Sequence, residues 1–199
     1  MVEKDKRIIC CLCIIYFYKE NWFSDAAAMN NILTSIEAAL NNQLQERAFH
    51  LRQSKKTISP VSRGVLLRLA AAADEHYEAL REIHKELLTN GTWLKKVLPV
   101  INKTDIVKPL LKIDVAEKEA SVANREDLDA LERAVKFEKW GYDFYMGLSK
   151  NAEAVSEKKF FELLASMKWE HLLSLKETML FHENPAVWAL THGNPHPDV

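Results

Sequence analysis

Apolar residues recur every three or four positions along most of the chain. In the first such stretch, Ile32, Ile36, Ala39, Leu40 and Leu44 fall on one face of a helix. The pattern predicts helices of about 25–30 residues each, which is longer than the average globular helix. Long helices joined by short turns are typical of an antiparallel bundle, so the expected fold class is all-α.

Helix-breaking residues bound the second predicted helix. Ser59-Pro60 predicts its start, with Ser as the N-cap and Pro at the first helical position. Asn90-Gly91 predicts its end, because these residues favour the backbone conformation that follows a helix. A first predicted helix, from about Asn30, therefore precedes the break at Ser59-Pro60.

Similar signals bound two further helices. Asn124 stands three residues before Asp127 and predicts a capping arrangement at the start of a third helix, which extends to about Asn151. Ser156 is expected to cap a fourth helix, which ends before Asn184-Pro185. The chain therefore predicts four helices.

An internal repeat relates the two predicted hairpins. Shifted by 95 residues, the first hairpin aligns with the second without a gap. Identical pairs include Ser54-Lys55 with Ser149-Lys150, and Glu75-His76 with Glu170-His171. We interpret the chain as one helical hairpin used twice, with residues 91–123 as a long crossover. Pseudo-two-fold symmetry would then bring the two repeated histidines toward each other.

The pattern divides the chain into a bundle over residues 29–183, a tail over residues 184–199 and an N-terminal segment over residues 1–28. In the N-terminal segment, a basic start is followed by an apolar run over residues 8–18 that is too short to span a bilayer as a helix. Three interpretations stay open: a signal peptide or anchor, a docking segment, or an extension upstream of a natural start at Met29.

Composition narrows the function classes. The chain has 199 residues, 48% of them hydrophobic, and a formal net charge of −1. Nothing in this balance suggests a nucleic-acid partner, and membrane attachment is expected only through residues 8–18. The cysteines Cys10, Cys11 and Cys13 stand together and predict no disulfide framework. We therefore expect a reducing compartment, the cytoplasm, unless residues 1–28 direct export or membrane attachment.

Three segments resemble rubrerythrin-type ferritin-like proteins. Residues 134–148 (AVKFEKWGYDFYMGL) are similar to the third helix of that family, residues 160–175 (FFELLASMKWEHLLSL) to its fourth, and residues 69–80 (LAAAADEHYEAL) to its second. The resemblance covers about residues 30–190 and implies a ferritin-like four-helix bundle.

In that family, two iron ions are held by a Glu on the first and third helices and by a Glu-x-x-His on the second and fourth. The resemblance implies that three matching positions keep a metal-ligating residue: His76, Glu138 and His171. The other three positions are altered, to Gln43, Ala73 and Lys168. A di-iron site that is mostly lost is therefore implied.

The remaining residues disfavour two iron ions, because iron needs anionic oxygen and Glu138 alone supplies it at these positions. Lys168 adds a positive charge that repels a cation. We expect Lys168 and Glu138 to form a buried ion pair flanked by two imidazoles, unless the Lys168 side chain extends to solvent. Glu46, one turn from Gln43, is an alternative inward-facing ligand.

The sequence therefore predicts a structural or interaction protein, without a cofactor and without enzyme activity, that forms a homodimer. The alternative is an oxidoreductase of peroxide or oxygen chemistry. It would hold a single iron, manganese or zinc ion at His76, Glu138 and His171.

Overall fold

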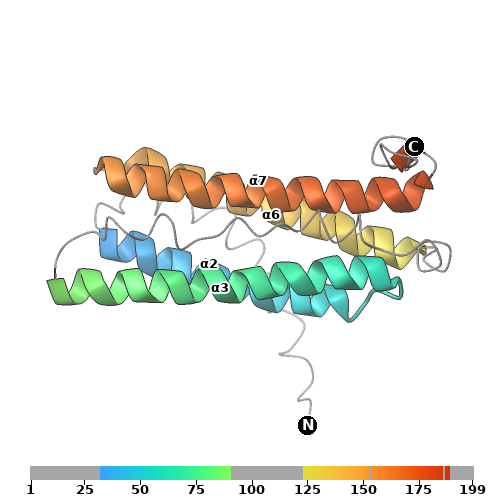
Figure 1. Ribbon diagram of the computed structural model, residues 1–199, viewed down its shortest axis with the longest axis horizontal. Coiled ribbons are helices and arrows are strands. Elements are labelled where there is room, and N and C mark those ends of the chain that lie inside the picture. The colour runs from blue at the N-terminus through green and yellow to red at the C-terminus, as the bar shows by residue number, and fades with distance from the viewer. Residues whose placement is uncertain (1–31, 91–122, 153, 186, 189–199) are drawn as a thin grey trace, which may run out of the picture.

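A computed structural model describes residues 32–90, 123–152, 154–185 and 187–188. These residues form four long helices that run side by side as a bundle (Figure 1). The helices are α2 (Ile32–Ser54), α3 (Pro60–Asn90), α6 (Arg125–Asn151) and α7 (Val155–Glu183). The predicted all-α four-helix bundle is confirmed.

The bundle consists of two hairpins. Helix α2 packs along α3, and α6 packs along α7, while α2–α6 and α3–α7 contacts hold the hairpins together (Figure 1). The predicted crossover, the segment 1–28 and most of the tail lie outside the described residues. Among the helices that the structure describes, none has a stretch long and apolar enough to cross a lipid bilayer.

Most of the predicted helix ends are confirmed. Helix α3 begins at Pro60, and the backbone N–H of Ser62 donates to Ser59 Oγ at 3.3 Å. The prediction for Ser156 is wrong, because α7 already begins at Val155 and its N-cap, Ala154, makes no side-chain capping bond. The connection after α6 is so short that Ser156 falls inside the first turn of α7.

Asp127 ties the two hairpins together at one end of the bundle. It forms a capping box with Asn124, in which Asp127 Oδ2 accepts the Asn124 backbone N–H at 3.0 Å. Its Oδ1 accepts the backbone N–H groups of Ile58 and Ser59, at 2.7 and 3.2 Å, from the turn between α2 and α3. A single buried carboxylate therefore satisfies backbone donors of both hairpins.

The interior has two apolar clusters with a polar layer between them. One cluster contains Ile36, Leu80 and Phe160, and the other contains Leu69 and Leu131. The polar layer contains four buried side chains of α3, α6 and α7 that fall between residues of the two clusters along each helix. These side chains are His76, Glu138, Lys168 and His171, and Gln43, Glu46 and His50 join them from α2.

Candidate metal centre

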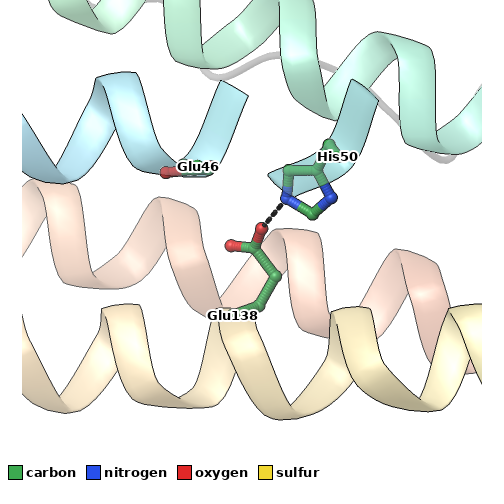
Figure 2. A group of neighbouring side chains, drawn as sticks. All are labelled: Glu46, His50 and Glu138. Atoms are coloured by element: carbon green, nitrogen blue, oxygen red, sulfur yellow. Dashed lines mark hydrogen bonds and ion pairs between the residues drawn. The ribbon is translucent and has the colours of Figure 1, made fainter. Parts of the chain in front are cut away.

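The buried face of α2 changes from apolar to polar along its length. Ile36 and Ala39 lie on this face, and Gln43, Glu46 and His50 continue it at three- and four-residue steps. Figure 2 shows Glu46 and His50 on successive turns of α2, with Glu138 of α6 directed toward them. The helix period therefore delivers a carboxylate and an imidazole from α2 to a carboxylate of α6.

Glu46, His50 and Glu138 form a compact buried group. His50 Nε2 lies 2.6 Å from Glu138 Oε1, and both side chains are fully buried (Figure 2). One ligand atom from each of the three residues lies within 4.8 Å of the others. Such a group could hold a metal ion, because carboxylate oxygen and imidazole nitrogen are common metal ligands.

Helix α7 adds an ammonium and an imidazole to this centre. Lys168 Nζ donates to Glu46 Oε2 and lies 3.8 Å from Glu138 Oε2. His171 Nδ1 lies 3.3 Å from Glu138 Oε2 and 3.8 Å from Glu46 Oε1, without hydrogen-bond geometry to either. Only 1% of Lys168 is exposed, so the alternative that it extends to solvent is wrong. The expected buried ion pair with Glu138 is therefore present, and Glu46 is the nearer of the two carboxylates.

His76 reaches the centre from α3. Its ring stacks on His171 with the centroids 6.0 Å apart and the planes 10° apart. Burial, together with the neighbouring charges of Lys168 and His171, lowers the pKa of His76 well below its ordinary value. In the folded protein this imidazole is therefore held in its neutral form, which is the form that ligates metals.

The two carboxylates have opposite pKa shifts. Burial raises the pKa of Glu46, and repulsion from Glu138 adds to the rise despite the Lys168 ammonium. Burial alone would also raise the pKa of Glu138, but Lys168, His171 and His50 outweigh it and hold that pKa well below the ordinary value. Glu138 is therefore the more firmly ionised carboxylate of the centre.

A second, neutral group of hydrogen-bonded side chains contains Gln43, Tyr145 and Asn42. Gln43 Nε2 donates to the Tyr145 hydroxyl at 2.7 Å, and that hydroxyl donates to Asn42 Oδ1 at 3.2 Å. Burial and the Glu46 carboxylate raise the pKa of Tyr145 well above its ordinary value, so the phenol stays protonated. Gln43 is thus a partner of Tyr145, and its Oε1 has no hydrogen-bond partner among the described residues.

The residues predicted from the sequence are all buried in the middle of the bundle. His76, Glu138 and His171 come close together, while the most compact ligand group contains Glu46 and His50 in place of the two repeated histidines. Glu46 had been expected only as an alternative, and His50 was missed. Their four-residue spacing on the buried face of α2 was the available signal. Ala73 is also buried and supplies no donor atom.

The donor atoms fit a metal ion. Several buried polar atoms here have no hydrogen-bond partner among the described residues, which is unusual for a folded protein unless an ion or water occupies the site. The atoms are Glu46 Oε1, Glu138 Oε2, His50 Nδ1, His171 Nδ1 and both ring nitrogens of His76. Glu138 is the single carboxylate at the six matched positions, and the alternative ligand Glu46 turns inward one turn beyond Gln43. The centre therefore has two carboxylates and three imidazoles.

No protein-family model, curated protein or solved structure matches the chain. The resemblance to rubrerythrin-type proteins therefore stays a prediction. The chemistry of this buried centre is therefore the basis for a function.

Proposed function

We propose that this chain is a ferritin-like metalloprotein that binds one divalent first-row transition metal ion through Glu46, His50 and Glu138. The observation that supports this proposal is the convergence of buried carboxylate and imidazole atoms that lack hydrogen-bond partners. Leaving such atoms unpaired in an apolar bundle costs free energy, and a cation coordinated by them offsets that cost.

The donor set favours particular metals. Imidazole suits iron and zinc, while carboxylate oxygen suits manganese and also binds the other two. Iron, manganese and zinc are therefore the ions that we expect. Three protein ligands leave coordination positions open, and a redox-active ion would supply electron transfer to oxygen or peroxide there. We propose oxygen or peroxide chemistry as the activity of an iron or manganese form.

The chain's own residues would prepare the site. Glu138 Oε1 contacts His50 Nε2 and orients that ring, while Glu138 Oε2 lies toward Lys168 and His171. The apolar clusters on both sides restrict water at the centre, which strengthens each electrostatic contact.

The test is metal binding by the full chain. Chelator-treated protein is titrated anaerobically with ferrous iron, manganese and zinc by calorimetry, and protein from metal-supplemented medium is analysed for its elements. We expect one ion per chain, and at least tenfold weaker binding in His50→Leu and Glu138→Gln.

Glu37→Gln is the matched control, because Glu37 and His84 form a second Glu–His contact, at 3.4 Å, with Glu37 largely exposed. This control should bind metal as the parent does. Absence of binding in the parent, or equal affinity in all variants, would overturn the proposal.

A metal-free structural or interaction protein is the second candidate. The observation in its favour is that each carboxylate already has a cationic or imidazole partner: Lys168 for Glu46 and His50 for Glu138. These contacts already give each buried carboxylate a partner, so a metal is not required to compensate them. A folded parent that binds no metal in the titration would favour this candidate. The homodimer expected for it stays a prediction.

A further inference from the structure

The aliphatic part of the Lys168 side chain packs over Gly141 of α6. A Cβ placed on Gly141 of α6 would lie 3.3 Å from Cδ, 3.5 Å from Cγ and 3.7 Å from Cε of Lys168. The missing side chain of Gly141 therefore leaves the room that the stem of Lys168 fills. The ammonium is directed inward, since almost none of the residue is exposed.

The two carboxylates present different oxygens to different neighbours. Glu138 uses Oε1 for His50 and turns Oε2 toward Lys168 and His171. Glu46 uses Oε2 for Lys168 and turns Oε1 toward His171, at 3.8 Å. Glu46, His50 and Glu138 form one candidate cation position. The Lys168 ammonium and His171 contact the same two carboxylates, so the ammonium occupies a second place beside them.

We propose that the ammonium of Lys168 is a tethered cation that fills the second position and limits the centre to one metal ion. This inference rests on the proposed function and adds a residue that determines its stoichiometry. Two carboxylates balance the charge of one divalent ion, and the ammonium adds a further positive charge beside it. A second divalent ion would be repelled at short range in a medium of low dielectric constant.

Removing the ammonium should open the second position. His171 and the stacked His76 then offer imidazole nitrogens that have no hydrogen-bond partner among the described residues, next to the shared carboxylates. Lys168→Met keeps an unbranched stem over Gly141 and removes the charge. Lys168→Glu also removes the charge and adds a third carboxylate.

The experiment is manganese binding followed by electron paramagnetic resonance on the full chain. We expect one manganese ion per chain in the parent, with the signal of an isolated ion. Lys168→Met and Lys168→Glu should bind two ions with the signal of an exchange-coupled pair. Lys139→Met is the control, because Lys139 forms an exposed pair with Asp143 at 2.5 Å, and it should bind one ion.

The outcomes separate the two proposals. A parent that binds no manganese overturns the proposed function, and this inference with it. A parent and both variants that bind one isolated ion overturn this inference alone. A coupled pair in the parent also overturns it, and that measurement does not depend on whether either variant folds.

Discussion

Two hydrogen-bonded pairs cross the same interface, between α2 and α6, and they differ in charge. The 95-residue shift that relates the hairpins maps Gln43 onto Glu138 and His50 onto Tyr145. The His50–Glu138 contact, at 2.6 Å, is thus the counterpart of the Tyr145–Gln43 bond, at 2.7 Å. One pair contains a carboxylate and an imidazole, and the other contains an amide and a phenol.

The same 95-residue shift relates two further pairs of positions. Glu46 maps onto Gly141, and Lys168 maps onto Ala73, so these two buried charged residues have small residues as their counterparts. The small residue is of use in at least one case, because Gly141 leaves room for the Lys168 stem. A repeated backbone therefore carries an asymmetric site. The charged or metal-ligating side chains stand at Glu46, His50, Glu138 and Lys168. Their counterparts are Gly141, Tyr145, Gln43 and Ala73.

The largest expected effect on stability follows from removing the ammonium of Lys168. Lys168→Ala leaves Glu46 and Glu138 without their cation inside the bundle, which should lower the free energy of unfolding by about 3–5 kcal/mol in metal-free protein. Urea denaturation measures the change. Lys139→Ala, at an exposed ion pair, should cost about 0–1 kcal/mol. Equal losses in the two variants would contradict the buried pairing.

Loss of the His50–Glu138 contact should lower the free energy of unfolding by less. His50→Leu removes one partner of the ionised Glu138, and a hydrogen bond to a charged group contributes about 1.5–3 kcal/mol. We expect a loss in that range by the same denaturation assay. A variant as stable as the parent would show that the His50–Glu138 contact contributes nothing to folding.

The neutral Tyr145–Gln43 pair should matter less to stability than the His50–Glu138 pair, and it should not affect metal binding. Tyr145→Phe removes a hydroxyl that bonds Gln43 and Asn42, leaving buried amides unsatisfied at a cost of about 1–2 kcal/mol. Metal affinity should match the parent. If Tyr145→Phe weakened metal binding as strongly as His50→Leu, the Tyr145–Gln43 and His50–Glu138 pairs would not differ in function.

The smallest effect concerns pH. The lowered pKa of His76 means that the unfolded chain takes up a proton below about pH 6.5 while the folded protein does not. Unfolding is then favoured as pH falls, so His76 should subtract about 1 kcal/mol of stability between pH 7 and pH 5.5 in metal-free protein. His76→Leu should show a flatter pH dependence. An unchanged slope would mean that His76 titrates alike in both states.

Periodicity and end signals were enough to predict the helices. Pro60 sets the backbone at the start of α3, and the capping box of Asn124 and Asp127 joins residues three apart, so both signals can be read from neighbouring residues. Ser156 failed because the length of the preceding connection, rather than its capping ability, decided where α7 begins.

The site was predicted only in part. The 95-residue repeat correctly placed His76, Glu138, Lys168 and His171 in the interior. It missed His50 because symmetry pairs that residue with Tyr145, which is not a typical ligand, and the repeat therefore gave no signal there. Which polar residue of α2 faces the centre depends on the packing of α2 against α6, and a sequence repeat does not report that packing.

Metal binding by two symmetry-related variants tests the central claim most directly. Parent, His50→Leu and Tyr145→Phe are freed of metal and titrated anaerobically with ferrous iron and manganese by calorimetry. We predict one ion per chain in the parent and in Tyr145→Phe, and at least tenfold weaker binding in His50→Leu. No binding by the parent, or the same affinity in all three proteins, would contradict a metal centre at Glu46, His50 and Glu138.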